Sequence, residues 1–459
     1  MRFTSPVGLT VGALMMLVDG IEAQVHHHQG PECQSTNFTS VPQRLEFTIE
    51  KEAVLRHVEQ IKRISDVVPF HHRVTGSVGS NSTINYIANQ LKTVGYDIEV
   101  VPFSAEIQVY SRAELMIEGN PVLHMRLEQA VWSPYGKWTH RRVVPASNDG
   151  CHIEDYPHRA RGQVAVVNGV GCPLSKKSSI AKSAGVAVLM VTEDTELQPT
   201  LGNPDEPHVA TVKLIAKNPS QLLSNLTHTN TTAYVDIEVH TKLASVESAS
   251  IIATSKCGYD GRTLMLGTRT DSFHRSAGLN DNASGVAALL ETAIQLSKYR
   301  TTNRVKFAFW TAGHSDNYGS RAWAQRQSER DLDQIKFYLD ANMLGSANGF
   351  PQVIGGTNPT TGLPGPAGSD RGVDVLRGFF GHNHIASKVV DYSGRGDYQT
   401  FLDVGIPAAG LFGGADGIKT PWEASNSPKQ RAAAGMPYDP VYNRPTTKLG
   451  ALLMDPELL

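Results

Sequence analysis

Residues 264–272 read Leu-Met-Leu-Gly-Thr-Arg-Thr-Asp-Ser, and residues 278–285 read Gly-Leu-Asn-Asp-Asn-Ala-Ser-Gly. The first segment begins as an apolar strand at 264–268 and ends in polar residues. The second leads into 285–296, where apolar residues recur at helical spacing. A further apolar run at 305–310 is typical of a central strand that is covered on both faces. A strand, a helix and a strand in this order indicate an α/β fold.

The rest of the chain continues this alternation. Helical spacing of apolar residues and terminal turn formers predict helices at 51–67, 82–94, 320–329 and 373–380. Short β-rich runs predict strands at 98–103 and 408–412. We therefore expect a mixed, mostly parallel sheet sandwiched by helices.

Composition and the N-terminus indicate the compartment. The 459 residues carry a formal net charge of -2, so nothing points to nucleic acid or a membrane surface as a partner. An apolar run at 7–18 follows Arg2 and ends near Ala23, which predicts a signal peptide at 1–23. No later segment reaches the roughly 20 apolar residues of a transmembrane helix. We expect a protein that is secreted or lies in the lumen of a vacuole.

Cysteines and glycosylation sequons agree with that route. Cys151 and Cys172 are the best disulfide candidates, while Cys33 and Cys257 either pair or stay free. The sequons predict glycosylation at Asn37, Asn81, Asn225 and Asn230.

Five segments resemble motifs of the di-zinc aminopeptidases of the aminopeptidase Y or secreted leucine aminopeptidase type. They are Gly267–Ser272, Asn280–Gly285, Phe309–Ser320, Asn342–Ser346 and Asp439–Asn443. The resemblance covers nearly the whole mature chain. It implies a zinc-aminopeptidase-like α/β domain, made here of 24–127 and 241–459. Residues 128–240 resemble an inserted protease-associated α/β domain, which implies a contact surface for another protein.

The metal positions of these motifs differ from the family pattern. Where the resemblance implies a His ligand the chain has Arg269, and where it implies the general base it has Gly313. The remaining ligands are replaced by His314, Asn342 and Asn443, so that only the bridging Asp281 is unchanged. A guanidinium has no lone pair for a metal, and amide oxygens are poor zinc ligands. We therefore expect no metal and no other cofactor.

The replaced residues still form a polar set. We take His314, Arg269 and Tyr442 as candidate catalytic residues. Asp271, Asp281, Asn342 and Asn443 are candidate ligand-binding residues for a small or peptide-derived molecule. The Arg269 guanidinium is expected to pair with Asp281 in the place of a metal, and the resemblance implies a cis peptide between Asp281 and Asn282.

Three interpretations remain open at this stage. The chain is a pseudopeptidase that binds a ligand, an enzyme that uses the same pocket without metal, or a conventional zinc aminopeptidase that releases N-terminal residues from peptides. The ligand, the oligomeric state and the partner of the inserted domain do not follow from the sequence.

Overall fold

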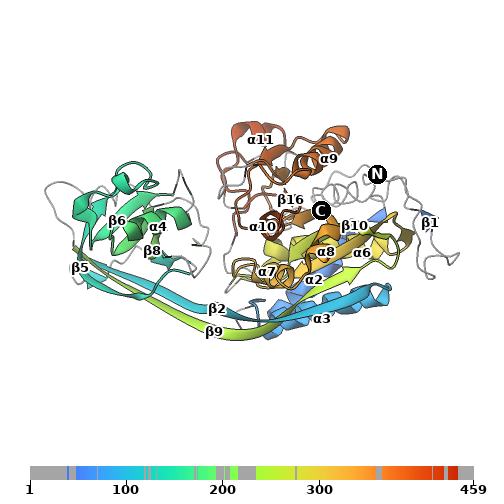
Figure 1. Ribbon diagram of the computed structural model, residues 1–459, viewed down its shortest axis with the longest axis horizontal. Helices are drawn as coiled ribbons and strands as arrows, with labels where there is room; N and C mark the ends of the chain where they lie inside the picture. Colours follow the sequence, from blue (N-terminus) through green and yellow to red (C-terminus); the bar gives the residue numbers. More distant parts are fainter. Residues whose placement is uncertain are drawn as a thin grey trace. The chain divides into compact units, whose positions relative to one another are not determined.

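The chain forms two compact units. The computed structural model describes residues 39–40, 48–69, 71–117, 120–121, 126–130, 132–169, 172, 174–192, 201, 207–215, 234–273, 276–357, 364–415, 417–427 and 433–442. The first unit consists of residues 1–105 and 246–459, and the second consists of 106–245. Two long strands, β2 (Asp97–Ile117) and β9 (Tyr234–Thr254), contribute residues to both units (Figure 1).

The sheet of the first unit has the expected mixed, mostly parallel character. Its strand order is β15-β14-β16-β13-β10-β12-β9, in which β16, β13, β10 and β12 run parallel to their neighbours in that block. Strand β9 is antiparallel to β12, and β14 is antiparallel to β16. The strands are β10 (Tyr259–Arg269), β12 (Asn303–Trp310), β13 (Ile335–Ala341), β14 (Gln352–Ile354), β15 (Lys388–Val390) and β16 (Ala408–Phe412). A separate short pair joins β1 (Thr39–Ser40) to β11 (Tyr299–Arg300).

Helices cover both faces of this sheet, which confirms the predicted layers. Alternate residues of β10 enter different cores: Leu264 and Leu266 enter the first, and Met265 enters the second. The first core holds the apolar faces of α2 (Lys51–Asp66), α3 (Val78–Thr93), α6 (Gly285–Leu296) and α9 (Ser369–His382). The second holds residues of α7 (Tyr318–Ala324) and α10 (Tyr398–Asp403). Burial on both sides explains the continuous apolar run of β12.

One predicted helix is wrong. The segment 320–329 contains two helices, because α7 ends at Ala324 and α8 (Glu329–Gln334) begins after Ser328. The Ser328 hydroxyl accepts a hydrogen bond from the Asp331 amide and so caps the new helix. The residue at the N-cap of α7 is Asn317, and the Asp316 carboxylate pairs with Arg321 at 2.9 Å. A short helix, α11 (Pro421–Ser425), follows near the C-terminus.

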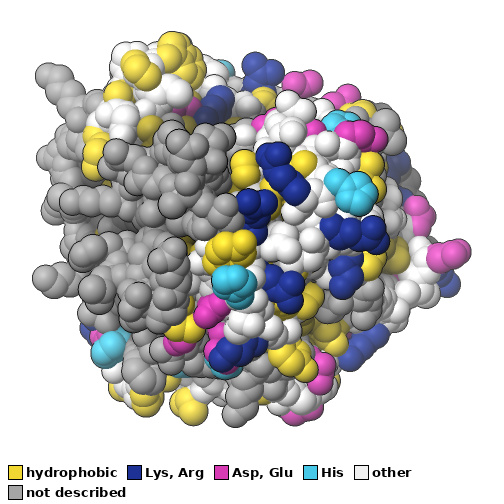
Figure 2. All heavy atoms as spheres, turned by 90° about the vertical axis from the view of Figure 1, so that its left-hand side faces the viewer, with side chains coloured by type: hydrophobic (Ala, Val, Ile, Leu, Met, Phe, Trp, Pro, Cys, Tyr) yellow, Lys and Arg dark blue, Asp and Glu magenta, His cyan; other side chains and the backbone are white. Residues whose placement is uncertain are grey.

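The second unit spans residues 106–245, a range that includes residues 128–240. Its strands follow the order β9-β5-β6-β7-β8-β4-β2-β3, with β5 to β8 parallel. Besides β2 and β9, its elements are β3 (Asn120–Pro121), β4 (Arg126–Gln129), β5 (Gly136–Pro145), β6 (Val164–Asn168), β7 (Val188–Thr192), β8 (Ala210–Ile215), α4 (Leu174–Ser183) and two short turns, η3 (Ile153–Asp155) and η4 (His158–Ala160). Lys and Arg side chains gather toward the middle of the face shown in Figure 2.

The cysteine and membrane expectations have the following outcomes. Cys151 and Cys172 form the expected disulfide, with their Cα atoms 5.9 Å apart. Cys257 is also disulfide-bonded, and Cys33 lies outside the described residues. Among the described helices, none is both long enough and apolar enough to cross a membrane. The predicted signal peptide lies outside this part of the chain, as do Asn37, Asn225 and Asn230. Asn81 is exposed on α3.

Candidate functional site

The candidate residues meet at the carboxyl edge of the first unit's sheet. Arg269 is the last residue of β10, His314 lies in the loop after β12, and Asn342 follows β13 directly. Asp281 lies in the irregular helical turn η5 (Leu279–Ser284) that precedes α6. Because β10, β12 and β13 are parallel neighbours, the residues after their ends fall on one edge, where α/β folds place their ligands.

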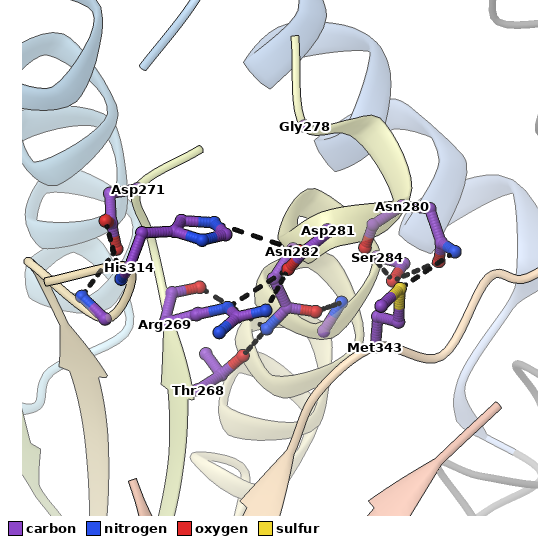
Figure 3. Close-up of polar contacts among 12 residues, drawn as sticks. Thr268, Arg269, Asp271, Gly278, Asn280, Asp281, Asn282, Ser284, His314 and Met343 are labelled. Atoms are coloured by element: carbon purple, nitrogen blue, oxygen red, sulfur yellow. Dashed lines mark hydrogen bonds and ion pairs between the residues drawn. The ribbon is translucent and has the colours of Figure 1, made fainter. Parts of the chain in front are cut away.

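A buried ion pair occupies the centre of the site. Arg269 Nε lies 3.0 Å and Nη2 lies 2.5 Å from Asp281 Oδ1, so two donors share one carboxylate oxygen (Figure 3). The contact predicted between these two groups is present, and the expected cis peptide between Asp281 and Asn282 is present as well. Burial alone would raise the pKa of Asp281, but the Arg269 charge, His314 and the hydrogen bonds from Arg269 and Tyr442 together outweigh it, and the pKa lies below its ordinary value.

The pair also holds the guanidinium in its charged form. Burial alone would lower the pKa of Arg269, whereas the Asp281 carboxylate raises it above the ordinary value. A cation that cannot be neutralised therefore lies against Asp281 at any physiological pH.

His314 faces the same carboxylate from the loop after β12. Its Nε2 lies 3.8 Å from Asp281 Oδ2 and has no hydrogen-bond partner in the described part of the chain (Figure 3). Burial, together with the nearby Arg269 charge, lowers the pKa of His314. The imidazole is therefore neutral near pH 7, and a neutral ring can either donate or accept a proton at Nε2.

Asp271 holds the loop that carries His314. Its carboxylate accepts hydrogen bonds from the backbone amides of Gly313, at 2.9 Å, and His314, at 3.2 Å. The Thr75 hydroxyl adds a third contact at 3.4 Å. The Asp271 carboxylate therefore orients the loop that carries His314, and its predicted contact with a ligand stays a prediction.

Gly313 packs directly against the arginine. A β-carbon on Gly313 would lie 2.7 Å from Arg269 Cβ and 2.7 Å from its Cδ. Such distances are too short for any side chain, so the aliphatic stem of Arg269 requires glycine at this position. The two replacements at 269 and 313 are therefore sterically linked.

Asn342 and Tyr442 complete the described polar set. Both are buried, and Asn342 Oδ1 has no hydrogen-bond partner among the described residues. The Tyr442 hydroxyl is hydrogen-bonded to Asp281 and contributes to the lowered pKa of that carboxyl. Asn443, the last candidate, lies outside the described residues.

Two supporting residues were missed by the sequence analysis. Arg73 is fully buried, and its guanidinium donates to the carbonyl oxygens of Thr270, Ala277 (3.2 Å) and Gly278 (2.8 Å). Asn280 Nδ2 donates to Asp439 Oδ2 at 2.7 Å and to Ser346 Oγ at 3.0 Å, which ties three of the motif segments together. Arg73 is a single arginine between α2 and α3, and no local sequence pattern shows that it binds backbone carbonyl groups of a distant segment.

The donor set does not fit a zinc pair. Asp281 Oδ1 is taken by the guanidinium, and the residue at 313 has no side chain. In the described ranges no group of three or more His, Cys, Asp or Glu side chains is arranged to hold a metal ion. A catalytic zinc usually has three protein ligands, and here only Asp281 and His314 offer suitable atoms.

Comparison with known proteins identifies the family. The model of peptidase family M28 matches residues 250–448. The leucine aminopeptidase 2 of Trichophyton rubrum is 30% identical over 403 residues, which cover 87% of this chain and 80% of that protein. The chain belongs to peptidase family M28. The M28 match includes Arg269, Asp281, His314 and Asn342.

Solved structures share the M28 fold. The aminopeptidase from Aneurinibacillus sp. strain AM-1 superposes with a TM-score of 0.63 at 23% identity, and covers 88% of this chain and 89% of its own. The zinc aminopeptidase BSAP from Bacillus subtilis gives a TM-score of 0.57 at 18% identity, and covers 87% and 90%. At these identities the likeness establishes the fold alone and does not establish the activity of this chain.

Proposed function

We propose that this chain is a metal-free member of the M28 family. It binds a small or peptide-derived molecule at the Arg269–Asp281 site and does not hydrolyse peptides through zinc. One observation carries the proposal, which is the guanidinium of Arg269 seated on Asp281 Oδ1.

The charge at this position opposes a metal directly. A unit charge beside a dication at about 4 Å, with an effective dielectric near 20, costs roughly 4 kcal/mol per unit-charge pair. The stem of Arg269 also fills the space beside Gly313, where the family resemblance implies the general base. A hydrolytic site would need both positions to change.

Two buried polar atoms that lack hydrogen-bond partners support the proposal that the site binds a ligand. His314 Nε2 and Asn342 Oδ1 are buried and lack hydrogen-bond partners within the described ranges. Buried polar atoms without partners cost about 1–3 kcal/mol each, so a ligand that supplies partners gains that energy. Small amides and peptide-derived molecules carry both donors and acceptors and suit this mixed set.

A zinc-dependent aminopeptidase is the second candidate. It is favoured by the name of the Trichophyton rubrum relative, which shares 30% identity with this chain. In that case the protein would release N-terminal residues from peptides, and Arg269 would have to leave Asp281 for metal to enter.

Metal content separates the two candidates. The purified protein is dialysed against buffer with zinc and then analysed for metal, and hydrolysis of an aminoacyl chromogenic substrate is measured in parallel. Essentially no zinc and no hydrolysis are expected. About two zinc ions per chain with hydrolysis would overturn the proposal and establish the aminopeptidase.

A single substitution sharpens this test. Arg269→His places an imidazole beside Asp281 and His314, which lie 3.8 Å apart through Nε2 and Oδ2. Three such ligands make a zinc site of the usual catalytic kind, so about one zinc per chain is expected. Arg371→His, on the exposed part of α9, is the matched control and should bind none. Equal metal content in wild type and both variants would contradict the role given to Arg269.

Binding and metal-free catalysis are separated by His314. If the site converts its ligand by acid or base chemistry, His314→Gln abolishes turnover while binding persists. A pure binding protein shows a change in affinity only. His158→Gln, at an exposed histidine of the second unit, controls for the loss of an imidazole.

The proposal extends to where the protein is located and how it is modified. We infer that the protein is secreted or vacuolar and glycosylated, and that 128–240 is a protease-associated domain with a protein partner. Exposure of Asn81 and the Cys151–Cys172 disulfide support an oxidising, glycosylating route. A mobility shift on enzymatic deglycosylation that disappears stepwise in sequon variants would test it. An unshifted protein from a secreting host would contradict it.

A further inference from the structure

A second group of buried polar atoms lies apart from the Arg269–Asp281 pair. Asp340 is in β13, and Asp397 directly precedes α10. In the described part of the chain, Asp340 Oδ2 and both carboxylate oxygens of Asp397 accept no hydrogen bond of ordinary geometry. The Tyr398 amide near Asp340 and the Ser320 hydroxyl near Asp397 still act to lower the pKa of these carboxyl groups. Each of these residues is at most 1% exposed. Buried carboxylates without a partner are costly and rare.

Two amide side chains add further unpartnered oxygens nearby. Asn317 Oδ1 and Gln399 Oε1 lack hydrogen-bond partners among the described residues, and both side chains are buried. Asn317 Nδ2 donates to the carbonyl oxygen of Gly394 at 3.4 Å, which turns its amide to the loop before Asp397. A β-carbon on Gly394 would lie 4.0 Å from Gln399 Oε1, so that oxygen faces the same loop.

Glycine at 396 brings Asp340 into this group. A β-carbon on Gly396 would lie 2.5 Å from Asp340 Oδ2, so only glycine permits the carboxylate to approach the loop so closely. Asp397 is the next residue, and its charge acts on Asp340 strongly enough to raise the pKa of that carboxyl, in addition to the effect of burial. The two carboxyl groups are therefore close neighbours.

The local charges do not balance. Arg73 and Arg269 are the guanidinium groups that act on the four buried carboxyl groups of Asp271, Asp281, Asp340 and Asp397. Arg321 also acts on Asp397, but its guanidinium is paired with Asp316. His314 stays neutral. With all four carboxyl groups ionised, two negative charges are left over, which is the charge that one divalent cation would neutralise. Burial and neighbouring carboxylates raise the pKa of Asp340 and of Asp397, so protons take the place of the cation when none is bound.

We propose that Asp340, Asp397, Gln399 and Asn317 form a binding site for a hard divalent cation of the calcium type. The unpartnered atoms are all oxygens, and calcium takes six to eight carboxylate and amide oxygens in flexible geometry. Zinc prefers nitrogen and sulfur, which this group lacks. The cation ties β13 to the N-terminal ends of α7 and α10 and stabilises the first unit. It lies outside the Arg269–Asp281 ion pair and requires no ligand there.

A luminescent lanthanide tests the site in the full chain. Tb³⁺ replaces calcium at oxygen sites and is sensitised by nearby aromatic rings. Tyr338 Oη lies 3.4 Å from Asp340 Oδ1 and accepts a hydrogen bond from Trp310 Nε1. We expect saturable Tb³⁺ emission, excited through these rings, in protein that has been stripped with a chelator. Added calcium should displace it.

Variants locate the binding. Asp340→Asn and Asp397→Asn should each weaken Tb³⁺ and calcium affinity by about tenfold or more, because each removes a ligand charge. Gln399→Met keeps the length and removes one neutral oxygen, so a smaller loss is expected and folding is preserved. Asp374→Asn, at an exposed position of α9, is the matched control and should bind as wild type does.

Two results would overturn the proposal. One is the absence of saturable emission in the wild-type protein, which would mean that water or protons satisfy these oxygens. The other is equal affinity in Asp397→Asn, Gln399→Met and Asp374→Asn, which would place the cation elsewhere. Calcium-dependent protection from thermal unfolding, measured on the same variants, provides a readout that does not depend on emission.

Discussion

The Arg269–Asp281 pair and the Asp340–Asp397 pair lie at one edge of the same sheet, yet their buried charges are compensated in opposite ways. In the first pair the guanidinium of Arg269, at the end of β10, supplies the counter-charge to Asp281 in η5, at 2.5 and 3.0 Å. In the second pair two like charges face one another, and burial raises the pKa of Asp397 to about 6. The chain therefore carries its own cation at one carboxylate and depends on an outside cation or proton at the other.

The largest effect should come from removing the internal cation. Arg269→Met leaves Asp281 buried and unpaired, so we expect a loss of about 3–5 kcal/mol in the free energy of unfolding. Denaturant titration measures it, with Arg371→Met on exposed α9 as control. The double variant Arg269→Met with Asp281→Asn should recover most of the loss. A single variant as stable as wild type would show that the pair does not compensate the burial.

The Asp340–Asp397 pair predicts that stability falls as pH rises in the mildly acidic range. Because the pKa of Asp397 is raised in the folded state, the folded protein binds more protons than the unfolded one between about pH 4 and pH 6. Chelator-treated protein should therefore lose roughly 1–3 kcal/mol of stability from this group as pH rises through that window. The Asp397→Asn variant should show a flatter profile. The raised pKa of Asp397 would be contradicted if the stability of the wild-type protein changed with pH in the same way as the stability of Asp397→Asn.

The pH behaviour of Asp281 provides the contrast. Its pKa is lowered, so the stability from its pair is present above the unfolded pKa of about 3.9 and is lost as pH falls through the folded value. The two pairs thus act in different parts of the acid range and can be separated in one titration series.

A smaller effect is expected from crowding the arginine. Gly313→Ala adds a methyl group 2.7 Å from Arg269 Cβ, which should cost about 1–3 kcal/mol. The cost should shrink when Arg269 is already replaced by glycine, because the β-carbon and the stem that cause the clash are then absent. A double-mutant cycle in denaturant measures this coupling. Additive costs would mean that the two positions are independent.

The smallest effect concerns the hydroxyl that borders Asp340. Tyr338→Phe removes the acceptor of Trp310 Nε1 and the group that lies 3.4 Å from Asp340 Oδ1. We expect about 1 kcal/mol of destabilisation in chelator-treated protein, measured by thermal unfolding. Tyr86→Phe, at a tyrosine hydroxyl that contacts His57 on the other side of the sheet, is the comparison variant.

The sequence predicted the layers well because they depend on local patterns. Apolar spacing defined α2, α6 and β12, and the order of elements defined a mixed sheet. The break between α7 and α8 was missed even though residues 325–331 are all polar. Ser328 followed by Asp331 is a capping signal that could have located it.

The site was only half accessible from sequence for a physical reason. Arg269 and His314 follow predicted strands, and Asp281 lies in the turn before a predicted helix, so their meeting could be foreseen. Asn342 follows β13, a strand that the sequence analysis did not predict. Asp340 and Asp397 lie 57 residues apart, and their approach depends on the close contact that Gly396 allows. Nor does any local pattern reveal that Asp271 is committed to the backbone amides of 313 and 314.

The contact between Gly313 and the stem of Arg269 also restricts how this protein could change over time. A glutamate introduced at 313 would collide with the arginine, whose atoms lie 2.7 Å from the new β-carbon. Under the proposed metal-free function, a histidine at 269 would remove only the contact with Cδ, because the β-carbon of residue 269 would remain. A glutamate at 313 would therefore also need the backbone at these two positions to move apart.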